Sequence, residues 1–246
     1  MPCPIQPPVS WNARASAAAN VAGDGTWPSD GARGTLHYTT MSQMLLFASD
    51  REMVLVNDAR GRIEYTTGFV PAELARAWFA ELREAVPWQT QRRTMYDREV
   101  DVPRLQAHVR LDVADAGVPE AIRCAARKVI AVTGAPFNSV GLNFYRDGRD
   151  SVAPHSDHLD EIVRGYPIAL VSLGATRRMT IRAKEPPRRT VHADLVAGSL
   201  LVMSYETQLH YTHGIPKTRE PTDGRISLAF RVRPASEREG ETSLSG

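Results

Sequence analysis

Histidine and aspartate recur in this chain as pairs separated by one residue, and each pair could supply two ligands to a metal ion. The pattern H-x-D occurs three times, as His155/Asp157, His158/Asp160 and His192/Asp194. A further histidine from elsewhere would complete two histidines and one carboxylate, the ligand set of non-haem Fe(II) oxygenases. The same set also holds catalytic zinc. The chemistry indicated is therefore oxidation with iron or hydrolysis with zinc.

Sequence context separates the three pairs. His155 and Asp157 follow an apolar strand and a glycine turn, in the stretch NFYRDGRDSVAPHSD over residues 143–157. An ordered strand edge holds ligands in a fixed geometry. The second pair lies in a polar loop, and the third alternates with apolar residues so that both its members face solvent. We therefore predict His155 and Asp157 as ligands and the other two pairs as surface residues.

The third ligand has two candidates, His210 and His213, in the stretch HYTHGIP. In an extended segment, side chains three residues apart point to opposite faces, so only one can reach the metal. His213 precedes Gly214 and Pro216, which would end a strand near the mouth of a barrel. We predict His213 as the ligand, with His210 beside the site or on the surface.

Arginines at both ends of the stretch RISLAFR, residues 225–231, favour iron over zinc. In a strand its apolar residues point into a core, and the remaining residues share the opposite face. These are Arg225, Ser227, Ala229 and Arg231. Two inward guanidiniums are costly without anions, and 2-oxoglutarate offers two carboxylates, whereas a zinc hydrolase needs no such anchor. Asn143 and Tyr145 also share a face and could donate hydrogen bonds to the same ligand.

Helical patterns precede a run of strands. One helix is predicted within residues 69–88, with Pro71 in its first turn, and a second over 119–133, ended by Gly134. In the second, Ile122, Ala125, Val129 and Val132 share a face, and Cys124 packs within the helix. Strands are predicted at 62–67, 139–146, 166–173, 178–183, 190–195, 199–204 and 226–232. This order indicates an α+β fold with a β-sandwich or barrel. Residues 92–110 fit a functional loop and a surface hairpin equally well.

Composition sets wider bounds. The chain has 246 residues, a net charge of +2 and two cysteines. These values fit a globular protein of a reducing, cytoplasmic compartment and do not by themselves indicate nucleic-acid binding. We expect no signal peptide and no membrane span. Residues 1–40 and 237–246 are predicted to be disordered tails around a domain over 41–236, with Met41 as an alternative start.

Together these motifs resemble the AlkB family of Fe(II)/2-oxoglutarate-dependent nucleic-acid dealkylases, over about residues 46–234. The strand and H-x-D of residues 143–157, the segments 168–182 and 198–218, and RISLAFR are similar to the family's segments in order and spacing. Ser227 stands where the family usually has Asn, Ala229 where it has Thr, and His108 where it has a large aromatic. The resemblance implies a double-stranded β-helix (jelly-roll) core with N-terminal helices on one side and a nucleotide-recognition lid formed by Pro103–Arg110.

The resemblance also implies roles for individual residues. Iron would be held by His155, Asp157 and His213, and 2-oxoglutarate by Asn143, Tyr145, Arg225, Ser227 and Arg231. Arg225 would pair with the distal carboxylate. Contacts to the substrate base or its phosphates are expected from Arg104, Gln106, His108, Asp160 and Arg177, with Arg178 a further phosphate candidate. For each arginine, a solvated surface position is equally expected.

The implied reaction is oxidative demethylation of N-alkylated bases in DNA or RNA by a monomer. It consumes 2-oxoglutarate and O2 and yields succinate, CO2 and formaldehyde. Three alternatives stay open: an oxygenase acting on a protein or small molecule, a non-catalytic nucleic-acid-binding protein and, least favoured, a zinc hydrolase. The sequence does not specify the lesion, the type of nucleic acid or its strandedness.

Overall fold

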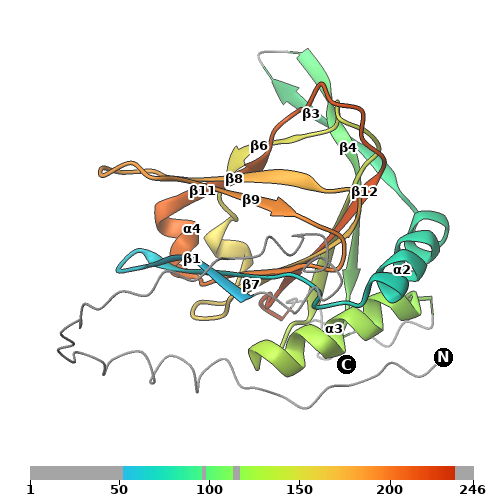
Figure 1. The fold of residues 1–246 in the computed structure, drawn as a ribbon, viewed down its shortest axis with the longest axis horizontal. Helices are drawn as coiled ribbons and strands as arrows, with labels where there is room; N and C mark the ends of the chain where they lie inside the picture. The colour runs from blue at the N-terminus through green and yellow to red at the C-terminus, as the bar shows by residue number, and fades with distance from the viewer. Residues whose placement is uncertain (1–51, 96–97, 113–116, 236–246) are drawn as a thin grey trace, which may run out of the picture.

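The computed structural model describes residues 52–95, 98–112 and 117–235, so the predicted tails and Met41 lie outside the described residues. Two β-sheets face each other, and two helices cover the outer side of the larger sheet (Figure 1). The larger sheet has the strand order β1-β2-β10-β7-β12-β5-β4-β3, and the smaller has the order β6-β11-β8-β9. All of their pairings are antiparallel. Two facing antiparallel sheets are the jelly-roll architecture, which confirms the predicted fold class.

The elements follow in chain order, with their bounds. They are β1 (Glu52–Asp58), β2 (Gly61–Thr66), α2 (Ala72–Ala85), β3 (Gln89–Met95), β4 (Arg98–Arg110), α3 (Glu120–Thr133), β5 (Ser139–Tyr145), β6 (Val152–His155), the 3-10 helix η3 (Leu159–Glu161), β7 (Ile168–Gly174), β8 (Arg177–Ala183), β9 (Thr190–Leu195), β10 (Leu200–Met203), α4 (Glu206–His210), β11 (Tyr211–Ile215) and β12 (Arg225–Arg231).

Both predicted helices are present. Pro119 stands immediately before α3, and Gly134 ends it with a φ of 69°, in the left-handed region that glycine adopts without strain. Ile122, Val129 and Cys124 are buried as predicted. Val132 is 37 % exposed, so its predicted place on the packing face was wrong. The helix buries a narrower stripe than its apolar residues suggest.

The larger sheet is buried on both faces because its central strands alternate between two cores. Ala169, Val171 and Leu173 of β7 pack toward the helices, whereas Ile168 and Leu170 pack toward the smaller sheet. The same alternation in β12 sends Ile226, Leu228 and Phe230 to the helices. It leaves Arg225, Ser227 and Ala229 on the opposite side, in the interior between the sheets, as predicted.

Residues 92–95 and 98–110 belong to two paired strands, which agrees with the hairpin rather than the loop of the two alternatives. β3 and β4 pair with each other, and β4 pairs with β5, so the hairpin extends the larger sheet at one edge. The Pro103–Arg110 stretch expected to form a lid is thus a sheet strand. The strands β1, β3, β4, β6 and β11 were not among those predicted from the apolar pattern. β6 and β11 matter most, because they carry two of the candidate ligands.

A candidate metal centre and its surroundings

His155, Asp157 and His213 converge in the structure as predicted. His155 ends β6, and His213 lies directly opposite it on the paired strand β11. The two imidazole centroids are 4.5 Å apart. One ligand atom from each of the three side chains lies within 4.8 Å of the other two. A single ion could be reached by all three after small side-chain rotations, and the donor set is that of a non-haem iron site.

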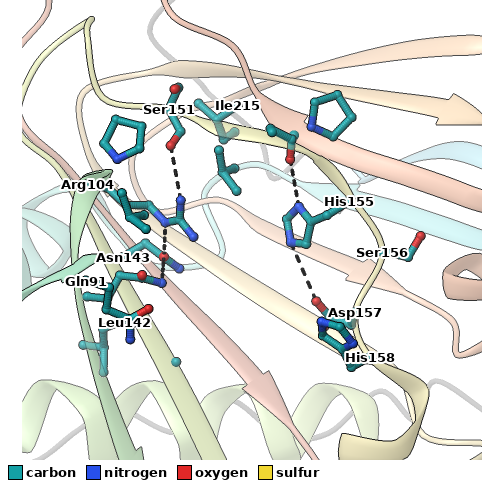
Figure 2. A pocket seen from close by; sticks show the side chains of 18 of the residues that line it. Gln91, Arg104, Leu142, Asn143, Ser151, His155, Ser156, Asp157, His158 and Ile215 are labelled. Carbon is teal, nitrogen blue, oxygen red and sulfur yellow. Dashed lines mark hydrogen bonds and ion pairs between the residues drawn. The ribbon is translucent and has the colours of Figure 1, made fainter. Parts of the chain in front are cut away.

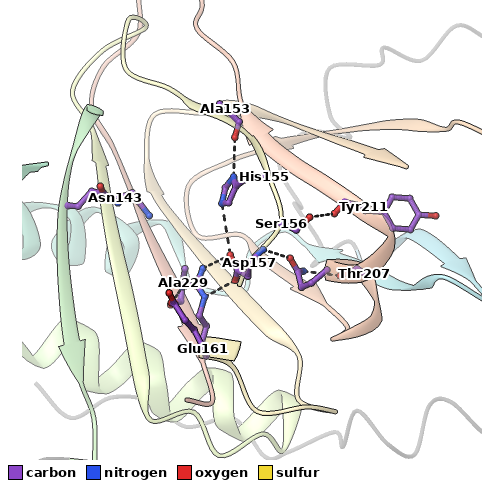
Figure 3. Close-up of polar contacts among 12 residues, drawn as sticks. Asn143, Ala153, His155, Ser156, Asp157, Glu161, Thr207, Tyr211 and Ala229 are labelled. Atoms are coloured by element: carbon purple, nitrogen blue, oxygen red, sulfur yellow. Dashed lines mark hydrogen bonds and ion pairs between the residues drawn. The ribbon is translucent and has the colours of Figure 1, made fainter. Parts of the chain in front are cut away.

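The tautomer of His155 suits metal binding. Its Nδ1 lies 3.0 Å from the carbonyl oxygen of Ala153 (Figure 3), and because a carbonyl only accepts, Nδ1 must carry the proton. In the neutral ring Nε2 then keeps its lone pair, and it lies 4.0 Å from Asp157 Oδ1. A backbone carbonyl that fixes the ring nitrogen in this way is a common support of metal-binding histidines.

Asp157 is held ionised by Arg231. The guanidinium donates from Nε and Nη2 to the two carboxylate oxygens at 2.7 and 3.1 Å. Burial is the largest single influence and raises the pKa of the Asp157 carboxyl, but the charge and hydrogen bonds of Arg231, together with His213 and His155, outweigh it, so the pKa is below its ordinary value. The guanidinium of Arg231 is thus paired with the carboxylate of a candidate ligand, and its contact with co-substrate oxygens stays a prediction.

His213 is neutral at physiological pH. It is buried, and burial lowers its pKa to about 4, with repulsion from the neighbouring His155 adding to the effect. A metal-binding imidazole must be unprotonated. The burial that positions His213 thus also keeps it ready to bind a cation.

We expect the metal-free protein to lose stability as the pH falls from 6.5 toward 4. In this window His213 is protonated in the unfolded chain but stays neutral in the folded chain, so lowering the pH favours unfolding. The shift of the pKa from 6.5 to about 4 corresponds to roughly 3 kcal/mol at pH 4. Urea unfolding at pH 7 and pH 4.5, with and without His213→Gln, would measure this contribution. An equal pH dependence in the two proteins would contradict it.

Gln208 supports the site and was not anticipated from the sequence. It is 2 % exposed on the short helix α4, and its Oε1 accepts a hydrogen bond from the Asp157 backbone N–H at 3.0 Å. Its Nε2 donates to Thr207 Oγ1 at 3.0 Å. Ser156 Oγ donates to the Tyr211 carbonyl at 2.9 Å and ties the same turn to β11. The turn that carries Asp157 is therefore fixed from two sides.

Gln208→Met is expected to weaken binding of Mn(II) or Co(II) about tenfold or more, the range found for residues that support metal ligands. The variant removes the acceptor of the Asp157 N–H while keeping the size of the side chain. Isothermal titration of the metal-free protein would measure the affinity. Leu209→Met, at a 44 % exposed neighbour on α4, serves as the control. Equal affinity in Gln208→Met and the native chain would show that the turn holds its position without this bond.

Arg225 is a buried cation without a complete set of partners. It is 1 % exposed, and its Nη2 donates to Ser172 Oγ at 2.9 Å. Within the described part of the chain, Nε and Nη1 have no hydrogen-bond partner. Burial lowers its pKa, and its Cζ lies 5.2 Å from the centre of the Tyr145 ring. Unpaired buried charge is strongly destabilising, so the site fits an anionic ligand such as a carboxylate.

The other residues predicted to bind 2-oxoglutarate gather around Arg225. β12 pairs with β5 so that Arg225 faces Tyr145 and Ser227 faces Asn143. Tyr145 and Ser227 are both 3 % exposed. Asn143, Tyr145 and Ser227 thus lie beside Arg225 as predicted, whereas Arg231 is paired with Asp157.

A cavity of about 1050 Å³ opens beside the metal ligands (Figure 2). Its wall includes the hairpin residues Arg104, Gln106 and His108 together with Asn143 and Asp157. His108 Nε2 lies 2.8 Å from Ser139 Oγ, and its pKa is lowered by partial burial and by Arg233. Three of the five residues predicted to contact substrate therefore lie at the cavity.

The remaining two residues predicted to contact substrate, Arg177 and Asp160, do not line the cavity. Arg177 is 3 % exposed, and its guanidinium donates to the carbonyls of Asp147, Asp150 and Pro216 at 2.8–2.9 Å. It holds loops together and is neither a phosphate ligand nor a solvated arginine. Asp160 is exposed and does not line the cavity, whereas its neighbour Glu161 does.

Arg178, His192 and His210 do not line the cavity, whereas His158 lines it next to Asp157. Arg178 makes an exposed bidentate pair with Asp194 at 2.7 and 2.9 Å. His158 and His192 are exposed, as predicted. His210 ends the helix α4, so its predicted extended backbone was wrong although its exclusion as a ligand agrees with the geometry.

Comparison with known proteins adds an independent finding. The model of the 2OG-Fe(II) oxygenase superfamily matches residues 62–231. The chain is 39 % identical over 119 residues to DNA oxidative demethylase ALKBH2 of Bos taurus, which covers 45 % of this chain and 43 % of that protein. It is 31 % identical over 183 residues to alpha-ketoglutarate-dependent dioxygenase alkB homolog 3 of Homo sapiens, covering 67 % and 64 %.

The match spans less than half the length of the ALKBH2 relatives from cattle, mouse and human. Among solved structures, a prolyl-4-hydroxylase from Pseudomonas putida superposes with a TM-score of 0.48 at 19 % identity, covering 70 % of this chain and 93 % of that one. Within the described residues, no helix has the length and apolar character needed to cross a membrane.

Proposed function

This chain belongs to the 2OG-Fe(II) oxygenase superfamily and, with its AlkB-homologue relatives, to the AlkB family within it, and from that premise we propose that it oxidatively removes N-linked methyl groups from nucleobases in DNA. The reaction would convert a methylated base, 2-oxoglutarate and O2 into the unmodified base, formaldehyde, succinate and CO2. Bound Fe(II) would supply the activation of O2, coupled to decarboxylation of 2-oxoglutarate.

One observation carries the proposal: a metal-ligand cluster and a buried, incompletely paired guanidinium share one jelly-roll interior. His155, Asp157 and His213 would hold the iron. Arg225 would receive the distal carboxylate of 2-oxoglutarate through Nε and Nη1, which have no protein partner in the described structure. A hydrolase would use the metal cluster but would leave this guanidinium unexplained.

The cavity and the hairpin suggest how a base would enter. A base inside a duplex cannot reach a buried metal, so it must leave the stack and enter a pocket. The cavity beside the ligands is at the upper end of the usual range for small-molecule sites. Its wall on the side of β4 is fixed by pairing to β5. We propose that this strand, rather than a mobile lid, forms one face of the base pocket.

The proposal is tested with oligonucleotides that contain 1-methyladenine or 3-methylcytosine, in DNA and in RNA, supplied with Fe(II) and 2-oxoglutarate. We expect succinate and formaldehyde in equal amounts, together with the unmodified base by mass spectrometry. His155→Ala is expected to form neither product. Succinate formed without base repair would favour the rival oxygenase of proteins or small molecules. Binding of oligonucleotides without any succinate would favour the non-catalytic rival.

A DNA substrate requires a location inside the cell, and we propose that the chain acts there as a monomer. Equilibrium sedimentation of the purified protein would test the monomeric state. Steep weakening of oligonucleotide binding with salt would support phosphate contacts, because each contact releases counterions.

A further inference from the structure

A buried arginine fixes the orientation of an amide on the cavity wall. Arg104 is 9 % exposed, and its Nε donates a hydrogen bond to Asn143 Oδ1 at 2.7 Å (Figure 2). A guanidinium can only donate. The Asn143 atom that faces it must therefore be the oxygen, and the Nδ2 amino group must lie on the other side of the amide.

The same oxygen fixes a second amide. Gln106 Nε2 donates to Asn143 Oδ1 at 3.1 Å. Because that oxygen only accepts, Gln106 must face it with its nitrogen, and the Gln106 Oε1 must point elsewhere. This Oε1 is buried and has no hydrogen-bond partner among the described residues. Because Arg104 can only donate, it fixes the orientation of the Asn143 amide and, through it, that of the Gln106 amide. The acceptor Gln106 Oε1 is therefore left without a partner among the described residues.

We propose that Gln106 is a specificity-determining residue whose Oε1 accepts a hydrogen bond from an exocyclic N–H of the substrate base, and that Arg104 is the positioning residue that sets this polarity. The inference rests on the proposed function, since it concerns the base that enters the same cavity. Gln106 lines that cavity together with His155 and Asp157. A buried acceptor without a donor costs free energy that a bound donor recovers.

The fixed orientation of the Gln106 amide determines which bases it can bind. Adenine and cytosine carry an exocyclic amino group beside the ring nitrogen that is methylated, and this group can donate to Gln106 Oε1. Hypoxanthine and uracil carry a carbonyl at the same position, which would set two oxygens against each other. An unlocked glutamine could turn its amide and accept either base. Here Asn143 and Arg104 prevent that turn.

Matched oligonucleotides test the inference by binding alone. One pair carries 1-methyladenine or 1-methylhypoxanthine, and the other 3-methylcytosine or 3-methyluracil, so that within each pair an exocyclic amino group on a cationic base is exchanged for a carbonyl on a neutral one, and the comparison with Gln106→Met isolates the hydrogen bond from the charge. Binding is measured by fluorescence anisotropy with Mn(II) and a 2-oxoglutarate analogue that cannot be decarboxylated. We expect the native chain to bind the amino member about tenfold tighter or more. Gln106→Met is expected to bring the ratio close to one.

Further variants separate polarity from packing. Gln106→Glu keeps acceptor oxygens and is expected to retain a preference for the amino member. Arg104→Met releases both amides and is expected to reduce the ratio while preserving affinity for the carbonyl member. Gln91→Met makes the same chemical change at an exposed position of the same cavity and is expected to leave the ratio unchanged. Thermal melting of each variant reports its folding.

Equal affinity of the native chain for the two members of both pairs would overturn the inference. An unchanged ratio in folded Gln106→Met would also overturn it. Neither result depends on turnover. Failure of the native chain to demethylate any oligonucleotide would refute the proposed function, while the binding ratios would still decide the role of Gln106.

Discussion

Replacing His213 with leucine is expected to abolish succinate formation, lowering it by more than about a hundredfold. Residues that only support metal ligands already contribute 10–100-fold to metal affinity or activity, and His213 would be a ligand itself. Its imidazole lies against that of His155, in the group of three that includes Asp157. Without it, one histidine and one carboxylate are left, which is too few to hold Fe(II) tightly in competition with water.

Leucine is chosen because the position is buried. His213 is 6 % exposed and lies between Ile181 of β8 on one side and His155 of β6 on the other. A neutral imidazole replaced by an apolar side chain of similar size leaves no buried charge, so the metal-free variant should melt at or above the native temperature. Loss of activity together with retained folding would then identify a loss of metal binding rather than a collapse of the site.

His192→Leu is the matched control. It belongs to another H-x-D pair, on β9, and it is exposed. We expect native metal content and native succinate formation from this variant. Metal content is measured by elemental analysis after dialysis against Fe(II) or Mn(II). If His213→Leu retained metal and activity while His192→Leu lost them, the assignment of the ligands would be wrong.

The convergence of the three candidate ligands was predictable from the sequence because local order and residue chemistry agree at these positions. His155 and Asp157 follow the clear strand pattern of β5, and His213 stands next to Gly214, where β11 approaches β6 closely. A Cβ at Gly214 would lie 2.9 Å from the Val152 carbonyl oxygen. The sequence therefore carried both the ligand types and a sign of close strand contact. The alternating pattern of β12 likewise predicted that Arg225 faces inward.

Partnerships between distant side chains could not be predicted in this way. Arg177 and Arg178 are neighbours of the same type, and only the pairing of β8 decides that the first is buried against loop carbonyls and the second is exposed. Arg231 has the inward position that the pattern implies, but its partner, Asp157, is 74 residues away in the chain. Gln208 lies in a five-residue helix that is too short to leave a periodic signal.

Replacing Arg225 with methionine is expected to change two properties in opposite directions. It should raise the KM for 2-oxoglutarate about a hundredfold, because truncating one partner of a buried, hydrogen-bonded charge pair costs about 2–5 kcal/mol. It should also leave the ligand-free protein as stable as the native chain, or more stable. The reason is that ligand-free Arg225 is a buried charge whose Nε and Nη1 lack partners in the described structure.

Thermal melting with and without 2-oxoglutarate, in the presence of Mn(II), measures both effects. A ligand that binds only the folded state raises the melting temperature, so the native chain should be stabilised by 2-oxoglutarate and Arg225→Met should not. Arg178→Met removes an exposed arginine of β8, which pairs with Asp194 on the neighbouring strand β9, and should respond like the native chain. Arg225→Lys is expected to restore binding only partly, because an ammonium lacks the planar fork that binds both carboxylate oxygens.

If Arg225→Met bound 2-oxoglutarate normally, another cation would have to hold the distal carboxylate of 2-oxoglutarate. Arg177, the second guanidinium beside the Tyr145 ring at 5.7 Å, already donates to three carbonyls, so in this structure Arg225 is the better placed of the two.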